Sequence, residues 1–489
     1  MEGNSYDACK AIALDDAGNV YATGYFSTTV DFDAGPGVYN LTSVNAEDAY
    51  MAKYDATGKL LWAKAIGDFR YQAGNAISLD ANGNIYVTGI FFGTTDFDPG
   101  TAVFNLVSAG NEDIFVSKFD NAGNFIWANR FGGPTNDFCN AIKIDAFGNI
   151  YFNGYFENTA DFDPGTGVFN LVSAGSTDIF VCKLSNNGNL LWAKKIGGPS
   201  SDAAYDIDLD AQGNVYCTGF YWATSDFDPG PGTFNLTSPA LGNGYILKLS
   251  NNGDFIRVAD LGGDSRVRCI AMKLDNSGGL CLTGHFDGAA DFDPGSGTAL
   301  LNSAIDDDDI FLGKYDLDFN LLWIKQIEGP SFQKVFDIDV DAADNIYTTG
   351  HYNGTADFDP GAAEHKLIAA NDPDVFVLKL KPNGEFVWVA PATGSFFGSG
   401  YSLKVDKTNN IYVGGTFEGT KDFDPGPDEV KRTSAGQSES FIEKLRQCPN
   451  AAITQTLNVI SCTSYKLGNK TYDSTGTYTH LVLNAQGCD

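Results

Sequence analysis

Apolar residues along this chain fall into short runs that recur with a fixed period, and glycine-rich turns separate the four runs of each period. In the second period the runs cover residues 73–80, 85–91, 113–118 and 125–128. The second and third runs are almost continuously apolar, whereas a strand with one face in water alternates. Both faces of each predicted sheet must therefore be covered, although no segment of helical period is present to cover them. Four-stranded sheets that cover one another around an axis solve this problem.

The stretch Asp96-Phe97-Asp98-Pro99-Gly100 marks the period. Its Asp-Phe-Asp core occurs seven times, at intervals of 65 residues and once of 66. A fixed long period decides the architecture before any local assignment. We therefore expect an all-β protein: a seven-bladed β-propeller of four-stranded antiparallel blades over residues 1–447, followed by a partial β module over residues 448–489.

The fourth run is missing from the last unit, which ends at residues 440–445 and continues into the tail. We expect this blade to have three strands and an unpaired edge, which residues 454–460 of the tail are candidates to cover. Residues 1–4 match the link between two units, such as 131–134. The chain is therefore expected to begin inside a longer protein, so that its lack of an export signal does not argue for the cytoplasm.

The formal net charge of -31 disfavours nucleic acid and anionic lipid as partners, and a soluble exported protein accounts for it as well. No apolar run reaches 18 residues, so no membrane insertion is expected. Cys9, Cys139 and Cys269 share one repeat position and should lie too far apart to form disulfides. In the tail, Cys462 and Cys488 are the best disulfide candidates.

Several positions recur in every unit or nearly so. The phenylalanine of Asp-Phe-Asp points away from both carboxylates and is expected to anchor its loop in the core. A tryptophan in the fourth run is likewise expected to pack in the core, and because Arg257 replaces it in the fourth unit, that blade should pack less well. Lys118 ends the third run and Asp80 ends the first, so this repeated pair is expected to share one rim, where the two side chains can pair or cap the turn, and pairing is the preferred interpretation.

The carboxylates of Asp-Phe-Asp lie at the opposite rim, where the third run of five units opens with another acid. Three carboxylates without a nearby base raise one another's pKa unless a cation or backbone donors intervene. Oxygen ligands with flexible spacing favour Ca²⁺, so the hypothesis is a peripheral Ca²⁺ site in several blades, and the alternative is turn capping by Asp before Pro-Gly. Gly244 and Ser440 interrupt the third-acid pattern. The expected metal ligands are Asp31, Asp33 and Asp48; Asp96, Asp98 and Asp113; Asp161, Asp163 and Asp178; Asp291, Asp293 and Asp309; and Asp357, Asp359 and Asp374.

The unit with Gly83-Asn84-Ile85-Tyr86-Val87-Thr88-Gly89, the run 113–118 and Trp127 resembles the SBBP β-propeller repeat over about nine-tenths of the chain. That resemblance implies a bacterial, exported, surface-associated protein and implies no chemistry. The tail, with residues 461–465 and 476–479, is similar to small β modules of secreted Bacteroidetes proteins. The stretch 54–62 also resembles a quinoprotein repeat, a family of enzymes with a Ca²⁺-bound quinone, but the adjacent cysteine pair of that family is absent.

No catalytic residue is assigned from the sequence, which shows no Ser-His-Asp order, histidine-rich metal motif or phosphate loop. His285 and His351 occupy a position where other units carry Tyr25 or Phe220, and we interpret them as core or rim substitutes. An enzyme should show polar residues around the axis that depart from the repeat. The fourth unit departs most, at Trp222, Gly244 and Arg257, and these residues form no catalytic set.

We therefore expect a non-enzymatic, extracellular or cell-surface module that binds a glycan or a protein at a loop-rich face. It is expected to be a monomeric part of a larger chain, with no cofactor apart from the hypothetical Ca²⁺. The alternative is a metal-dependent propeller enzyme, either a quinoprotein-like oxidoreductase or a lyase or hydrolase, that uses the central channel.

Overall fold

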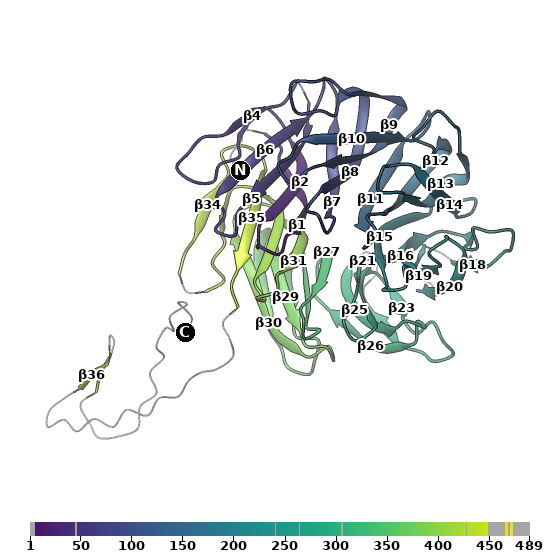
Figure 1. Cartoon of the computed structure of the whole chain (residues 1–489). Helices are drawn as coiled ribbons and strands as arrows, with labels where there is room; N and C mark the ends of the chain where they lie inside the picture. Colours follow the sequence, from purple (N-terminus) through teal and green to yellow (C-terminus); the bar gives the residue numbers. More distant parts are fainter. Residues whose placement is uncertain are drawn as a thin grey trace.

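The computed structural model describes residues 5–44, 46–239, 241–263, 265–304, 307–426, 428–447, 465–467 and 470–472. All elements within these residues are strands, and none of the described residues forms a helix long and apolar enough to cross a membrane. Six evenly spaced blades follow one another around a central axis, so the chain is an all-β propeller (Figure 1).

Each of the six blades is an antiparallel sheet whose four strands pair in chain order. Blade one consists of β1 (Ala8–Leu14), β2 (Val20–Phe26), β5 (Asp48–Tyr54) and β6 (Leu60–Ile66), and blade two consists of β7 (Gln72–Leu79), β8 (Ile85–Asp96), β9 (Asn105–Phe119) and β10 (Phe125–Phe131). Blade three consists of β11 (Asp137–Ile144), β12 (Ile150–Asp161), β13 (Asn170–Leu184) and β14 (Leu190–Ile196), and blade four consists of β15 (Ala203–Leu209), β16 (Val215–Tyr221), β19 (Asn243–Leu249) and β20 (Phe255–Leu261). Blade five consists of β21 (Val267–Leu274), β22 (Gly279–Phe286), β25 (Asp309–Asp316) and β26 (Leu321–Ile327), and blade six consists of β27 (Gln333–Val340), β28 (Ile346–Asp357), β29 (Lys366–Leu380) and β30 (Phe386–Gly394).

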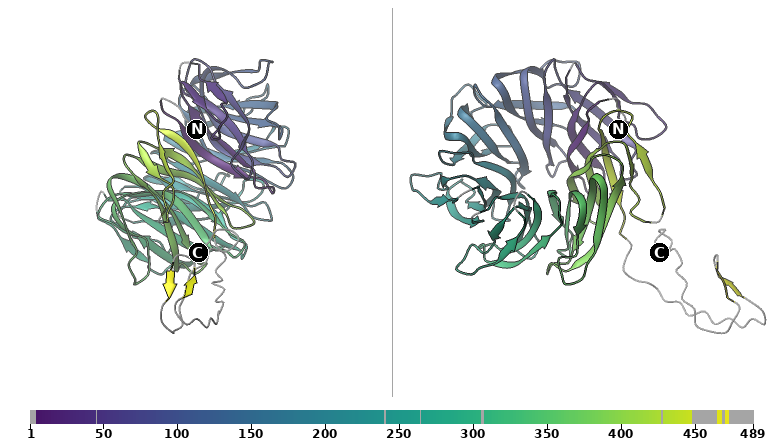
Figure 2. Two further views of the ribbon diagram at one scale, coloured as in Figure 1. Left: turned by 90° about the vertical axis from the view of Figure 1, so that its left-hand side faces the viewer. Right: turned by 180° about the vertical axis from the view of Figure 1, so that it is seen from behind.

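A three-stranded sheet of β31 (Gly398–Val405), β32 (Ile411–Phe417) and β35 (Glu439–Leu445) follows blade six, and we call it the C-terminal sheet. Its strand β31 contacts β27 and β28 of blade six and β1 of blade one. The hydroxyl of Thr416 donates to the carbonyl of Asp7 at 2.9 Å, and Tyr6 forms a parallel bridge with Ser438. The C-terminal sheet therefore lies between blade six and blade one and brings the two ends of the ring together (Figure 2).

Short hairpins extend the second and third strands outward. In blades two, three and six the strands continue through a register shift, such as the one between Phe92 and Thr94, and are therefore longer than predicted. In blades one, four and five the same segment forms a separate hairpin, whereas next to the C-terminal sheet it forms a hairpin that pairs with the end of β30 and extends the blade-six sheet to six strands. These hairpins are β3 (Thr29–Asp31) with β4 (Asn40–Thr42), β17 (Thr224–Asp226) with β18 (Asn235–Thr237), β23 (Ala289–Asp291) with β24 (Leu300–Asn302), and β33 (Thr420–Asp422) with β34 (Lys431–Thr433).

Within the tail expected over 448–489, the structure describes one hairpin, β36 (Tyr465–Leu467) with β37 (Lys470–Tyr472). Residues 454–460, which were candidates to cover the open edge, lie outside the described residues, as do Cys448, Cys462 and Cys488. The six other cysteines are buried and free, which confirms the expectation from spacing for Cys9, Cys139 and Cys269.

The hydrophobic core lies between neighbouring blades rather than inside any one of them. One cluster joins Tyr21 and Ile66 of blade one to Ile85 and Phe115 of blade two, and further clusters repeat this pattern around the ring. The phenylalanines of Asp-Phe-Asp are fully buried in blades one to six, and Phe97 packs edge to face on Phe91 with the ring centroids 5.3 Å apart. The expected anchoring role is confirmed, and the sheets do cover one another.

The prediction that blade four packs poorly at Arg257 is wrong. In other blades the strand-four tryptophan lies on a turn glycine of the next blade, and a Cβ on Gly123 would come within 3.3 Å of the Trp62 ring. Next to blade four that turn carries Phe319 instead, in a left-handed conformation with φ of 64°. Phe319 is buried and meets the ring of Tyr216 at 6.3 Å, as Trp127 meets Tyr86 at 6.4 Å. An aromatic side chain from the neighbouring blade thus fills the space that the missing tryptophan leaves.

Candidate functional site

The repeated aspartate and lysine do share one rim, but they pair in one blade only among the described residues. Asp275 and Lys314 form an ion pair of 2.6 Å. Elsewhere the aspartate caps its own turn: Asp80 accepts the backbone N–H groups of Asn82 and Asn84 and the amide of Asn84. Burial raises the pKa of Asp80, but these hydrogen bonds outweigh burial and hold the pKa below its usual value.

The repeated lysine instead reaches the next blade. Lys118 of blade two donates to the side chain of Asn186 in blade three and lies 4.9 Å from the ring centroid of Tyr86. Lys53 and Lys183 make the same contacts with Asn121 and Asn251. The shared rim and the alternative of turn capping are confirmed. The preferred prediction of pairing within each blade is wrong: the aspartate accepts turn N–H groups, so the lysine bonds to the next blade instead.

The Asp-Phe-Asp carboxylates cap their own loops in every blade in which a metal ligand was expected. Asp96 Oδ1 accepts the backbone N–H groups of Asp98 and Phe104 at 3.1 and 2.8 Å, and Asp98 Oδ1 accepts that of Gly100 at 2.8 Å. The same three bonds occur in the other four blades, formed by Asp31 and Asp33, by Asp161 and Asp163, by Asp291 and Asp293, and by Asp357 and Asp359. Turn capping thus accounts for these oxygen atoms.

The third acid is buried beside the link to the next blade, and in three blades it has the base that the sequence did not reveal. Asp113 pairs with Arg130 at 2.9 Å, Asp178 pairs with Lys195 at 3.0 Å, and Asp374 pairs with Lys421. Asp309 accepts from the amide of Gln326 at 2.7 Å. The expectation of three carboxylates without a nearby base is therefore wrong for these blades.

Asp48 of blade one is the exception, because Ala65 occupies the position that Arg130 holds in blade two. Burial, opposed by the N–H of Val44, raises the pKa of Asp48 to about 7. The register also shows that Asn243 and Glu439 occupy this position in blade four and the C-terminal sheet. Gly244 and Ser440 were therefore aligned one residue too far along the chain.

Within the described residues, no group of three or more histidine, cysteine, aspartate or glutamate side chains is arranged to hold a metal ion. The two carboxylates of each loop point their Oδ1 atoms at backbone donors, and the third acid faces a separate partner. A cavity of about 420 Å³ adjoins Asp357, Asp359 and Glu328, together with Lys325. The geometry fits turn capping better than a calcium site, and calcium binding stays a prediction.

An axial cavity of about 350 Å³ lies among the innermost strands of all the sheets. Aspartate and lysine side chains gather there, at two positions that recur in the first strand of each sheet. At one position Asp206 and Asp337 stand where blades one, two, three and five carry alanine. Two residues later Lys143, Asp208, Lys273, Asp339 and Lys404 alternate in charge around the ring. Sequence reasoning missed this cluster, although the departures from the repeat in the first run were the available signal.

The axial aspartates bind the inner strand of the following sheet. Asp206 Oδ2 accepts the N–H of Met272 at 2.8 Å, and Asp337 Oδ2 accepts that of Leu403 at 2.7 Å. Asp208 and Asp339 do the same for Leu274 and Val405. The innermost strand is an edge strand whose N–H groups face the channel, so these carboxylates satisfy donors that the ladder leaves open.

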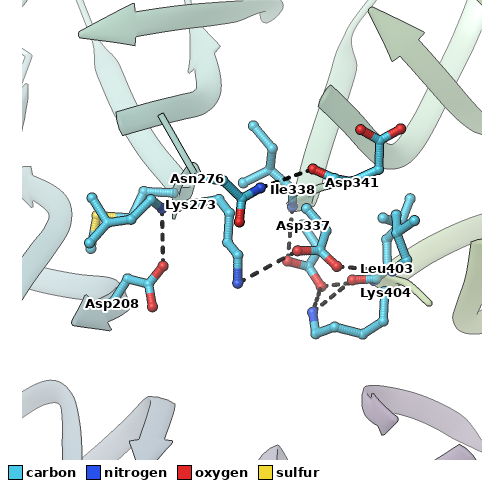
Figure 3. A network of polar contacts seen from close by, with 12 residues as sticks. Asp208, Lys273, Asn276, Asp337, Ile338, Asp341, Leu403 and Lys404 are labelled. Carbon is cyan, nitrogen blue, oxygen red and sulfur yellow. Dashed lines mark hydrogen bonds and ion pairs between the residues drawn. The ribbon is translucent and has the colours of Figure 1, made fainter. Parts of the chain in front are cut away.

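Three axial lysines lie beside three of these four carboxylates, and Asp206 forms no ion pair among the described residues. Lys404 Nζ lies 2.8 Å from Asp337 Oδ2 and turns toward it in Figure 3, while Lys143 and Lys273 lie 3.5 and 3.6 Å from Asp208 and Asp339. Burial raises the pKa of Asp206 to about 6, against the attraction of Lys143. Burial also raises the pKa of Asp208, but Lys143, Lys273 and two backbone donors hold it below the usual value.

Aromatic side chains pack in pairs on and beside the first and second strands of the blades, and one of them, Tyr401, lines this cavity. Tyr25 and Tyr71 pack at 6.2 Å, Phe138 stacks on Tyr155 at 5.0 Å, and Phe336 packs on Tyr401 at 5.3 Å. His285 and His351 are buried, and His351 packs on Phe336 with the ring centroids 5.5 Å apart. Burial lowers the pKa of His285 to about 4 and that of His351 to about 3, so burial disfavours a charge on either ring. Their burial agrees with the interpretation from sequence.

No family model matches the chain. The chain is 24% identical over 493 residues to the uncharacterised WD repeat-containing protein L264 of Acanthamoeba polyphaga mimivirus, covering 82% of this chain and 35% of the relative. It is 27% identical over 212 residues to the regulatory protein FlaEY of Caulobacter vibrioides, covering 42% of this chain and 21% of the relative. The chain thus spans about a third or less of the length of these relatives.

Among solved structures, a protein of unknown function from Bacteroides caccae has a TM-score of 0.36 at 9% identity, with 76% of this chain and 93% of that chain covered. Sqt1 from Chaetomium thermophilum has a TM-score of 0.41 at 11% identity, with 84% and 94% covered. The strand arrangement of the described residues makes the chain a β-propeller protein, and the mimivirus relative carries the name of a WD repeat-containing protein.

Proposed function

We propose that this chain is a non-enzymatic binding or scaffold module of a larger exported or cell-surface protein, with a glycan or a protein as its partner. The observation that carries the proposal is the use made of the axial carboxylates. All four accept backbone N–H groups of a neighbouring sheet, so they stabilise the ring and leave the loop-rich faces for recognition. Binding residues are commonly found on loops that a rigid scaffold positions.

In this proposal the C-terminal sheet is a seventh blade, and the repeats are of the SBBP type. Three observations support a seventh blade. The sheet contacts blades six and one as its neighbours contact one another, and Lys444 donates to the carbonyl of Ala56 at 3.0 Å, a blade-to-blade link like that of Lys118. Ser402 likewise accepts the N–H of Ile12 at 3.2 Å, at the position where Asp337 accepts that of Leu403.

One observation favours the alternative of a metal-dependent propeller enzyme: the charged residues that depart from the repeat do gather at the axis. A quinoprotein-like oxidoreductase, or a lyase or hydrolase, would use such a channel. The present geometry favours binding, because each axial aspartate already has a backbone donor.

A glycan array probed with the full chain, in calcium and in a chelator, tests the proposal. We expect saturable binding to one class of glycan, or capture of one protein partner when the array is silent. Turnover of a redox dye or a polysaccharide that is lost in the variant Asp337→Asn would overturn it in favour of the enzyme.

A further inference from the structure

The axial cavity contains one lysine whose charge no carboxylate balances. Lys143, Lys273 and Lys404 each face an aspartate within 3.6 Å. Lys10 of blade one lines the same cavity, but its Nζ lies 4.3 Å from the centroid of the Tyr401 ring instead. Among the described residues Lys10 makes no ion pair, and burial lowers its pKa. A half-buried cation that has an aromatic ring but no carboxylate beside it attracts an anion.

The surroundings of Lys10 favour a small polar ligand. Asn75 and Asn140 occupy the same inner-strand position in blades two and three and line the cavity with Lys10. Their side-chain NH₂ groups donate to the carbonyls of Cys139 and Ala204, so their amide oxygen atoms are the part left to accept from a ligand. Ser78 and Ser402 also line the walls. The cavity volume of about 350 Å³ lies at the lower end of the range of ligand pockets.

Resting on the proposed binding function, we propose that the axial cavity binds the carboxylate-bearing sugar of an acidic glycan, a hexuronate, through Lys10. The carboxylate pairs with the ammonium of Lys10, and the hydroxyls bond to the asparagine and serine side chains of the wall. A largely polar lining suits a polyhydroxylated sugar better than an apolar peptide side chain. On a chain of net charge -31, the unbalanced lysine also gives an anion one favourable point of entry.

Isothermal titration calorimetry of the full chain with sodium glucuronate, glucuronate methyl ester and glucose tests this proposal. We expect one saturable site for glucuronate and affinities at least about tenfold lower for the two neutral sugars, because a charge-assisted hydrogen bond is lost. Equal heats from all three sugars, or none from glucuronate, would overturn it. A short peptide with a free C-terminal carboxylate is the competing probe, and tighter binding of that peptide would replace the sugar by a chain terminus.

Variants locate the site. Lys10→Gln should weaken glucuronate binding about tenfold and Lys10→Arg should restore it, whereas Lys59→Gln, in an exposed turn, should change nothing. Ala76→Phe places a ring in the cavity while keeping Lys10 and should abolish binding. Each variant is checked for an unchanged melting curve. If Lys10→Gln and Ala76→Phe both bind normally, the cavity is not the site.

The failure of this inference is separable from that of the proposed function. A neutral glycan or a protein bound in the array experiment, together with no heat from glucuronate, would leave the binding module intact and remove only the uronate site. If neither the glycan array, nor the partner capture, nor the calorimetry detects binding, both the proposed binding function and the uronate site are wrong.

Discussion

At the scale of single residues, a buried group in this protein is explained by its partner across a strand or across a blade boundary. The third acid changes together with the residue that faces it: Asp113 with Arg130, Asp178 with Lys195, and Asn243 with Asp260, whose Oδ1 accepts from the Asn243 amide at 2.8 Å. Asp48 lacks such a partner. Its substitution therefore tests how much the burial of an unpaired carboxylate lowers the free energy of unfolding.

Asp48→Asn should stabilise the protein at pH 8 and should stabilise it less at pH 5. The pKa of Asp48 is raised to about 7 in the folded protein from an ordinary value of 3.8, so the folded state holds the proton more tightly. Its contribution to stability is therefore lost as the pH rises from about 4 to about 7. We expect a gain of about 1 to 2 kcal/mol at pH 8, a value reduced for solvent screening, from urea unfolding at both pH values.

Asp113→Asn is the matched control for that measurement. It should gain less at pH 8, since it also removes the ion pair with Arg130. Equal gains at the two sites would show that the cation has no influence on the buried acid.

Ala65→Arg should give Asp48 the partner that Asp113 has. Residue 65 pairs with Tyr50 as Arg130 pairs with Phe115, so an arginine there starts from the same position. The new cation should lower the pKa of Asp48 and flatten the fall in stability between pH 5 and pH 8, by about 1 kcal/mol at pH 8. Leu61→Arg, on the same strand but exposed, should leave the pH profile unchanged. A profile that Ala65→Arg does not flatten would contradict the pairing.

At the scale of elements, the fourth strand of one blade and the following turn of the next blade form one packing unit. A tryptophan requires glycine in that turn, because a Cβ would approach its ring to 3.1–3.3 Å at Gly123, Gly188, Gly253 and Gly384. Because Arg257 replaces the tryptophan in blade four, the space of the indole ring is empty, and Phe319 from the turn of the next blade occupies it. The residue type at the fourth-strand position therefore depends on the residue type at the turn position of the next blade, although about 60 residues separate the two along the chain.

A double-mutant cycle tests this dependence. Phe319→Gly alone should cost about 2 to 4 kcal/mol through the hole it leaves, reduced by about 1 kcal/mol of relieved backbone strain. Arg257→Trp alone should destabilise by crowding against Phe319. The double variant should recover most of both losses, because it restores the arrangement of Trp62 on Gly123. Urea unfolding of the wild type, the two single variants and the double variant measures the coupling energy between residues 257 and 319. Additive losses of stability would contradict the idea that Phe319 takes the place of the tryptophan.

At the scale of the whole molecule, the ring is held by contacts from each sheet to the next. The core clusters span blade boundaries, the rim lysines cross them, and the axial aspartates cap the neighbouring inner strand. Each blade thus depends on its neighbours to bury its apolar faces. The peripheral carboxylates take little part in this, since they cap loops on the outer side.

The response to calcium should therefore be small. Chelator-treated protein is expected to melt at the same temperature with and without millimolar Ca²⁺, because Oδ1 of both Asp-Phe-Asp carboxylates already accepts backbone N–H groups. Mg²⁺ at the same concentration controls for ionic strength. A saturable rise in melting temperature with Ca²⁺ alone would restore the calcium hypothesis. Asp357→Asn, beside the 420 Å³ cavity, would then be the first ligand variant to test.

The amino-acid sequence by itself determined the repeat, the strands and the anchoring phenylalanines, because the period of 65 residues and the turn glycines are local features. It could not show which residues of neighbouring strands and blades meet, since Asp113 and Arg130 come together only when strands pair, and Arg257 and Asp318 only when blades stack. The axial cluster was hidden for the same reason: Asp206, Lys273 and Asp337 lie on separate strands about 65 residues apart. Only closure of the ring places them around one cavity and leaves Lys10 there without a carboxylate.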